Sequence, residues 1–201
     1  MTDRTALIVG SGGHAHMLAS LLPHRRIRFL TEGDPGPDDI AQSDYFAGSP
    51  DREADHFIGI GDNEIRRAWF DRLKALGLAV ANCVAPTAWI AADAAVGEGL
   101  FLGPGAVVGA RARIGDNVIV NTLSSVDHDC DIGPDTQITP GVSLGSHVVM
   151  GRSCYLGMKS CLIPRVRLGD RVVVMAGSLV VRDAPDGVML GGSPARIMRG
   201  A

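Results

Sequence analysis

The sequence predicts a small parallel α/β domain over residues 1–83, a parallel β-helix over residues 84–185 and a C-terminal tail over residues 186–201. Three observations support this prediction. The second half repeats with a period of six residues, and the first half alternates strand-like and helix-like segments. The composition suits many tight corners around a core of small aliphatic side chains.

The composition narrows both the fold and the class of partner. The chain has 201 residues, of which 46% are hydrophobic, only 4% are aromatic and 26 are glycine. Few aromatic residues indicate a core of small side chains, and abundant glycine indicates tight corners. The net charge of −3 indicates no basic face of the kind that binds nucleic acid.

Neither a membrane span nor a secretory leader is expected. No apolar run approaches the roughly 18 residues of a spanning helix. Residues 1–15 hold only a short apolar stretch that leads into glycines. The four cysteines show no CxxC spacing, so we interpret them as reduced thiols. We therefore expect a cytoplasmic protein without membrane insertion.

The hexapeptide repeat is the most regular feature of the sequence. Steps of six from Val84 to Val180 meet an aliphatic residue or methionine every time, often followed by glycine. A period of six matches neither an α-helix nor a simple strand, so each unit is a short strand plus a corner. Three units close a coil of 18 residues. The first and fifth residues of each unit should point inward.

Residues 1–83 are typical of a small Rossmann-like α/β domain. We expect strands near residues 6–9, 26–30, 56–60 and 78–83, and helices near residues 15–22 and 63–76. Asp62 should cap the second helix and Gly77 should end it. Residues 31–55, rich in Asp, Gly and Pro, should form a loop without regular structure.

The turn after the first expected strand, Gly10-Ser11-Gly12-Gly13-His14, stands where α/β domains often bind phosphate. Backbone N–H groups and the helix N-terminus favour an anion there. A turn that merely connects the strand to the helix is the alternative. No long dinucleotide-binding unit follows, so NAD is not expected.

Both halves together resemble one family of hexapeptide-repeat acyltransferases, the bacterial N-acetyltransferases of nucleotide-linked 4-amino-sugars and the related sialic-acid O-acetyltransferases. The matching stretches are VGSGGHA at 9–15, IGDNEIRR at 60–67, VNTLSSVDHDCDIG at 120–133, LGMKSCLIP at 156–164 and GGSPARIMR at 191–199. The resemblance implies a left-handed β-helix, a homotrimer, and acetyl-CoA between neighbouring β-helices. It also implies a nucleotide-sugar in the N-terminal domain and a role in bacterial surface-glycan biosynthesis.

His128 is the expected general base. It follows the inward position Val126 by two residues, so its ring should point outward. An amine that attacks a thioester must lose a proton, and histidine titrates near neutral pH. A neighbouring carboxylate would orient the ring. The resemblance gives this role to Asp129, while Asp127 competes for it.

Coil stacking gives Asp129 a second expected environment. Residues 18 apart lie about 4.8 Å from each other on adjacent coils, so Asp129 should lie beneath His147 and above Arg111. A surface ion pair is therefore the alternative role of this carboxylate.

The expected reaction is direct acetyl transfer in a ternary complex, without a metal. A backbone N–H at a coil corner would suffice as oxyanion donor. Cys130 and Cys154 fall at inward positions, and Cys161 falls where partial exposure is expected. A covalent acetyl-cysteine is therefore not expected.

The resemblance also implies contacts for both substrates. Acetyl-CoA should contact Gln137, Ser146, Met158 and Ala176, with Gln137 in place of a histidine common in the family. The nucleotide-sugar should contact Gly12, Gly13, His14, Glu32, Gly61, Asn63 and Arg66. Thr31-Glu32 replaces an acidic pair of the family, which leaves the nucleotide open. Residues 191–196 either border the adenine or cap the last coil.

The predicted function is N-acetylation of the 4-amino group of a nucleotide-linked amino-deoxy sugar. Three alternatives stay open at this point. The same base would serve an O-acetyltransferase acting on a sialic-acid-like sugar. A metal enzyme such as a carbonic anhydrase needs three histidines at a subunit boundary, and only His128 and His147 lie in the coils. The third alternative is a non-catalytic structural trimer.

Overall fold

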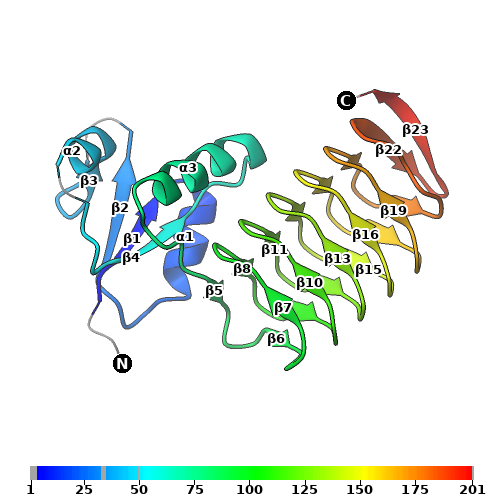
Figure 1. Ribbon diagram of the computed structural model, residues 1–201, viewed down its shortest axis with the longest axis horizontal. Coiled ribbons are helices and arrows are strands. Elements are labelled where there is room, and N and C mark those ends of the chain that lie inside the picture. The colour runs from blue at the N-terminus through cyan, green and yellow to red at the C-terminus, as the bar shows by residue number, and fades with distance from the viewer. Residues whose placement is uncertain (1–3, 33–34, 49, 201) are drawn as a thin grey trace. The chain divides into compact units, whose positions relative to one another are not determined.

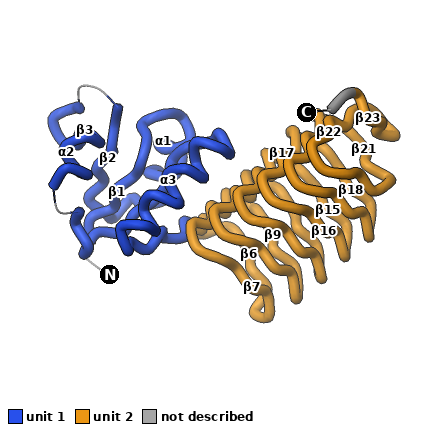
Figure 2. The backbone as a smooth tube through the Cα atoms, turned by 45° about the horizontal axis from the view of Figure 1, so that its top comes forward, with its two compact units in different colours: residues 1–83 blue, residues 84–201 orange. Residues whose placement is uncertain are grey.

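The computed structural model describes residues 4–32, 35–48 and 50–200. The chain folds into two compact units, Met1–Cys83 and Val84–Ala201 (Figure 2). The boundary between them coincides with the predicted start of the hexapeptide repeat at Val84.

The first unit contains a four-stranded parallel sheet (Figure 1). Its strands have the order β3-β2-β1-β4 and comprise β1 (Ala6–Val9), β2 (Ile27–Thr31), β3 (Ile40–Ala41) and β4 (Asp55–Ile58). Three helices follow strands of this sheet: α1 (Gly13–Ser20), α2 (Gln42–Ala47) and α3 (Asn63–Ala75). All four residues of β1 are buried, which explains its uninterrupted apolar run.

Helix α3 begins and ends as the sequence predicts. The Asp62 carboxylate accepts hydrogen bonds from the backbone N–H groups of Glu64 and Ile65, at 3.0 and 2.9 Å. These bonds satisfy two of the N–H groups that a helix N-terminus leaves without partners. Gly77 adopts a left-handed φ of +70° just beyond the helix, where glycine is favoured.

Two predictions for this unit are wrong. The expected loop over residues 31–55 contains β3 and α2, because Ile40, Tyr45 and Phe46 pack into the apolar core of the unit. Residues 78–83 do not form a fourth strand of the sheet. Within that range only Val80 pairs with the sheet, through an isolated parallel bridge to His56.

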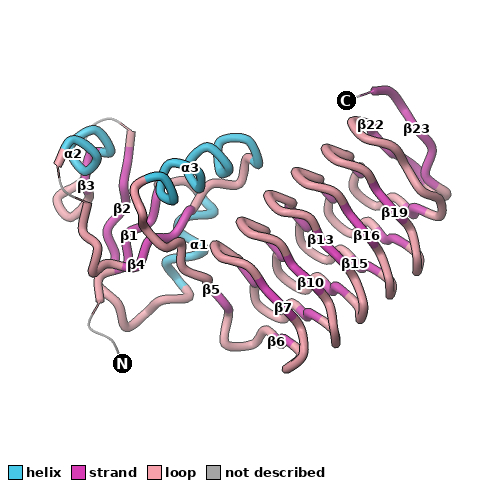
Figure 3. The backbone as a smooth tube through the Cα atoms, in the orientation of Figure 1, coloured by secondary structure: helices cyan, strands magenta, loops and turns pink. Residues whose placement is uncertain are grey.

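The second unit is a stack of two-residue parallel strands in three sheets (Figures 1 and 3). The β5 face comprises β5 (Cys83–Val84), β8 (Phe101–Leu102), β11 (Ile119–Val120), β14 (Gln137–Ile138), β17 (Tyr155–Leu156) and β20 (Val173–Val174). The β6 face comprises β6 (Trp89–Ile90), β9 (Val107–Val108), β12 (Ser125–Val126), β15 (Ser143–Leu144), β18 (Cys161–Leu162) and β21 (Leu179–Val180). The β7 face comprises β7 (Ala95–Val96), β10 (Arg113–Ile114), β13 (Asp131–Ile132), β16 (Val149–Met150) and β19 (Arg167–Leu168).

As far as Val180, each coil pairs with the next at a spacing of 18 residues, and the pairings of Ala184 and Met189 beyond it have a spacing of 16. Val126, for example, pairs with Val108 on one side and with Leu144 on the other. This register confirms the predicted coil length, and the stacked parallel strands fit a left-handed β-helix. First and fifth positions are buried along most of the stack. Val84 and Val96 are exceptions, because the first coil stacks against another coil on one side only.

The turns impose two backbone requirements. Most fourth positions of the repeat adopt a left-handed φ, including Arg111 (56°), Asp129 (59°) and His147 (60°). Second positions are often glycine because adjacent coils approach closely there. A Cβ on Gly109 would lie only 2.6 Å from the backbone nitrogen of His128 on the next coil.

The C-terminal residues extend the stack. Strand β22 (Val188–Gly192) pairs in parallel with β20 and antiparallel with β23 (Ala195–Gly200), so both strands continue the β5 face. Residues 191–196 therefore lie in a hairpin that pairs onto the last coil. Across the described residues, no helix is long and apolar enough to cross a membrane.

Val126 offers a direct test of the coil register, because its side chain is fully buried. Val126→Asp should bury a carboxylate without a partner and destabilise the unit by at least about 3 kcal/mol. Thermal unfolding followed by circular dichroism measures this loss. Leu123→Asp is the matched control, since Leu123 is 71% exposed and its left-handed φ suits Asp. Equal melting temperatures for the two variants would contradict the register.

Candidate active site

His128 lies on the edge of the β-helix formed by the turns that follow the β6-face strands. The fourth positions of these turns form one column of stacked residues, which we call the charge column. From the first coil onward it comprises Asp93, Arg111, Asp129, His147 and Arg165. Acidic side chains thus alternate with basic ones along much of this edge.

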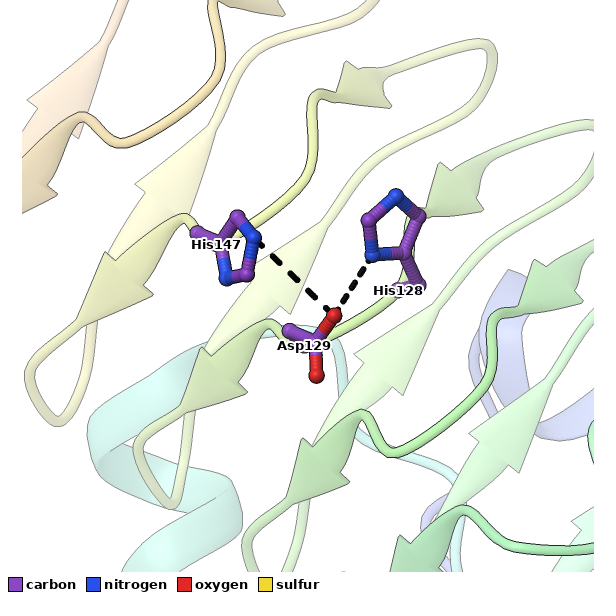
Figure 4. A group of neighbouring side chains, drawn as sticks. All are labelled: His128, Asp129 and His147. Atoms are coloured by element: carbon purple, nitrogen blue, oxygen red, sulfur yellow. Dashed lines mark hydrogen bonds and ion pairs between the residues drawn. The ribbon is translucent and has the colours of Figure 1, made fainter.

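The His128 ring is hydrogen-bonded to Asp129. The distance from His128 Nδ1 to Asp129 Oδ2 is 2.6 Å (Figure 4). Asp127 instead accepts a hydrogen bond from the backbone N–H of His128, at 2.7 Å. The His128 side chain is 46% exposed, in line with the predicted outward direction. With its proton on Nδ1, the ring presents the lone pair of Nε2 as a proton acceptor.

Asp129 also binds Arg111 through both carboxylate oxygens. Arg111 Nε donates to Oδ1 at 2.7 Å, and the terminal Nη2 donates to Oδ2 at 2.8 Å. These hydrogen bonds, followed by the bond from His128, hold the pKa of Asp129 well below its usual range. The carboxylate therefore stays ionised at neutral pH. The predicted ion pair and the predicted ring contact are present together.

His147 lies on the other side of the same carboxylate. Its Nε2 is 4.0 Å from Asp129 Oδ2, and its ring meets the His128 ring edge-on with centroids 5.5 Å apart. The backbone N–H of His147 donates to the carbonyl of His128 at 3.1 Å. The predicted stacking of Asp129 between Arg111 and His147 is confirmed.

The four residues expected to contact acetyl-CoA fall into two groups on one chain. Ser146 is 18 residues beyond His128 and stacks on it along the same edge. Met158 and Ala176 stack on a different edge, formed by the turns after the β5-face strands, and Met158 is 56% exposed. Gln137 lies in β14 on the adjoining β5 face.

Three of the four cysteines are poor nucleophiles in this fold. Burial raises the pKa of Cys130 and of Cys154 to about 11, and that of Cys83 to about 12. Cys161 is half-buried, as its position in the repeat predicts. Thiolates are the reactive form of cysteine, so the three buried thiols are unsuited to covalent catalysis.

In the first unit, the glycine turn opens onto space at the start of α1. Gly12 is the N-cap residue and Gly13 is the first residue of the helix. A Cβ on either glycine would have no neighbour within 4 Å, so a ligand can approach the backbone closely. Burial, with a smaller effect of Arg66, lowers the pKa of the adjacent His14 to about 4. His14 is therefore a neutral hydrogen-bonding group at pH 7.

Three further candidates form one hydrogen-bonded turn between β4 and α3. Arg66 is only 1% exposed and donates to the Gly61 carbonyl at 2.9 Å and to the Asn63 side chain at 2.8 Å. The guanidinium therefore shapes this turn from within. Because β1 and β4 are parallel neighbours, this turn and the glycine turn leave the sheet at the same edge.

Glu32 lies apart from these residues, directly after β2. It lines a cavity of about 300 Å³ together with Thr31, Gln42, Ser43 and Arg72. The Arg72 guanidinium stacks 4.0 Å above the Phe46 ring. Because residues 31–55 were predicted to be a loop, the sequence did not predict that α2 lines this cavity. The aromatic pair Tyr45-Phe46 was the sequence signal for a packed element there.

Solved structures match this chain over its whole length. The acetyltransferase domain of PglB from Neisseria gonorrhoeae FA1090 is 30% identical with a TM-score of 0.89, over 98% of this chain and 100% of that one. The chain belongs to this family of hexapeptide-repeat acetyltransferases. The PglB domain has also been solved in complex with acetyl coenzyme A.

Two further comparisons place the acetyltransferase among its relatives. A histidine-to-asparagine mutant of perosamine N-acetyltransferase from Caulobacter crescentus, in complex with CoA and GDP-perosamine, is 29% identical with a TM-score of 0.88, over 100% of this chain and 99% of that one. Putative acetyltransferase YvoF from Bacillus subtilis (strain 168) is 33% identical over 91 residues, which are 45% of each protein. The match thus spans less than half of that curated relative's length. No family model matches the chain.

Arg111 is the main cause of the low pKa of Asp129, so Arg111→Gln should raise that pKa toward its ordinary value. A carbon-13 NMR titration of the Asp129 carboxyl group measures the change. Arg113→Gln, two residues further along in β10, removes the same charge without touching the pair and is the matched control. An unchanged Asp129 titration in Arg111→Gln would show that another group keeps the carboxylate ionised.

Proposed function

We propose that the acetyltransferase transfers the acetyl group of acetyl-CoA to the 4-amino group of a nucleotide-linked amino-deoxy sugar, with His128 as general base. The hydrogen bond between His128 and Asp129, on an exposed edge of the β-helix, is the observation that carries this proposal. The substrate class is supported by the perosamine N-acetyltransferase complex with CoA and GDP-perosamine, which matches the chain over its whole length.

In the proposed reaction, the nitrogen of the sugar amine attacks the thioester carbonyl carbon. His128 Nε2 takes a proton from the amine as it attacks. The C–N bond forms first, and the C–S bond breaks as the tetrahedral intermediate collapses. The imidazolium then returns its proton to the departing thiolate, which leaves as CoA. Asp129 accepts the Nδ1 hydrogen bond and stabilises the imidazolium. Arg111 holds the carboxylate in this orientation, and a backbone N–H of the turn binds the oxyanion.

The proposed acetyl-CoA site lies between two copies of the chain in a homotrimer. His128 and Ser146 lie on one edge of the β-helix, whereas Met158 and Ala176 lie on another. One elongated ligand contacts both groups when the first edge of one copy faces the second edge of a neighbour. Repetition of such a head-to-tail contact around a three-fold axis closes a ring.

The first unit is proposed as a Rossmann-like domain that binds the nucleotide-sugar. In its strand order β3-β2-β1-β4, successive connections run to one side of β1 as far as β3, and the connection to β4 then crosses to the other side of β1. Ligands of open α/β sheets bind at such a switch point, beyond the carboxyl ends of the strands. The glycine turn after β1 and the Gly61–Asn63 turn after β4 both lie at this point. Gly12 and Gly13 would bind the phosphates, and the cavity lined by Glu32, after β2, would bind the nucleoside.

His128→Ala should lower kcat by about 10²–10⁴, the usual contribution of a positioned proton acceptor. Asp129→Asn should cause a smaller loss of kcat, because the Asp129 carboxylate orients the ring without taking the proton. Initial rates of acceptor acetylation measure both losses. Asp127→Asn is the control, because that carboxylate binds the His128 backbone. Near-normal turnover of His128→Ala would refute the mechanism.

The acceptor is tested by comparing nucleotide-linked 4-amino-4,6-dideoxy sugars with the corresponding free amino-sugars and with free sialic acids. Only the nucleotide-linked amines should be acetylated efficiently, because the glycine turn binds phosphate. Chromatographic detection of the acetylated product measures the preference. Exclusive modification of sialic-acid hydroxyls would favour the O-acetyltransferase alternative. Equal rates with the free amino-sugar would contradict the proposed N-terminal site.

A further inference from the structure

Three metal-ligating side chains converge on the charge column. One ligand atom from each of His128, Asp129 and His147 lies within 4.8 Å of the other two, and no other such group occurs among the described residues. Figure 4 shows both rings directed at the same carboxylate oxygen. The two histidines come from adjacent coils, so the stack itself brings the donors together.

We propose that His128, Asp129 and His147 bind one Zn²⁺ ion and that this ion inhibits acetyl transfer. Two imidazole nitrogens and one carboxylate oxygen are a donor set that Zn²⁺ accepts. Ligands bound at about 2.1 Å to a tetrahedral ion lie about 3.4 Å from one another. The separations of 2.6 and 4.0 Å from Asp129 Oδ2 to the two nitrogens bracket that value.

The site is both held in place and open to solvent. The backbone bond from His147 to the His128 carbonyl fixes the two turns relative to each other. Arg111 holds the carboxylate from the opposite side and keeps it ionised, which is the form that binds a metal. In the single chain, the side chains of His128, Asp129 and His147 are 46%, 23% and 42% exposed, so an ion reaches them without any opening of the fold.

The inhibition follows from the tautomers of His128. In the proposed reaction the ring carries its proton on Nδ1 and accepts a proton at Nε2. An ion bound at Nδ1 excludes the proton from that nitrogen, and the neutral ring then carries its single proton on Nε2. The number of protons on the ring is unchanged, but the accepting nitrogen is blocked. The ion is thus an inhibitor, and it does not alter the prediction of a reaction without a metal cofactor.

Binding is tested on the full, untagged chain after removal of metal with a chelator. Calorimetric titration with ZnCl₂ should give one site per chain, and Co²⁺ should give the visible absorption of a bound ion. His147→Asn and Asp129→Asn should each weaken binding at least about 10-fold. Asparagine suits the left-handed φ at both positions, so these variants should fold. His24→Gln, an exposed histidine of the first unit, is the control and should bind like the original chain.

Inhibition rests on the proposed function and is measured separately. Zn²⁺ should lower the rate of acceptor acetylation by the original chain and by His24→Gln. His147→Asn should keep its own metal-free rate at the Zn²⁺ concentration that halves the original rate. The product is quantified by chromatography, because Zn²⁺ also binds the thiol of CoA. Failure of every acceptor would refute the proposed function and leave the binding measurement valid. Zn²⁺ affinity unchanged by His147→Asn, or absent from the original chain, would refute the metal site.

Discussion

The stacking of each coil on the next determines the position of nearly every side chain in the second unit. Backbone hydrogen bonds between adjacent coils place residues 18 apart opposite each other, and this register holds as far as Val180. This constraint requires short strands, left-handed turns and glycine where two turns approach closely. In return, it aligns side chains that are distant in sequence without any long-range loop. Arg111, Asp129 and His147 meet only because their spacing equals one coil.

Positive φ angles at non-glycine residues are the energetic cost of this arrangement. A left-handed backbone costs an L-residue roughly 1–2 kcal/mol, although Asp and Asn tolerate it better. The column places Asp129 at such a position, where the carboxylate reaches its own neighbour His128 and the residues above and below. The backbone conformation that closes the turn thus also presents the carboxylate to three partners at once.

The sequence predicted the β-helix well because a six-residue period is a local pattern that repeats in every coil. It also predicted the outward direction of His128 and the stacking around Asp129. It left Asp127 and Asp129 as competitors, because both flank the histidine and only the turn geometry distinguishes them. It missed α2, since six residues are too few to show helical periodicity, and with α2 it missed the cavity beside Arg72. The repeat pattern treats every unit alike, so it did not predict that Val84 and Val96 of the first coil are exposed.

Because of the charge column, insertion or deletion of a coil is tolerated at some places along the β-helix and not at others. Duplication or deletion of a whole coil of 18 residues preserves the inward and outward pattern, so the core accepts it anywhere along the stack. A coil inserted between Arg111 and Asp129 would separate a pair now joined by two hydrogen bonds, and one inserted after Asp129 would move His147 out of reach. Coils can therefore be gained or lost toward either end of the stack, whereas the turns around Asp129 must keep their order.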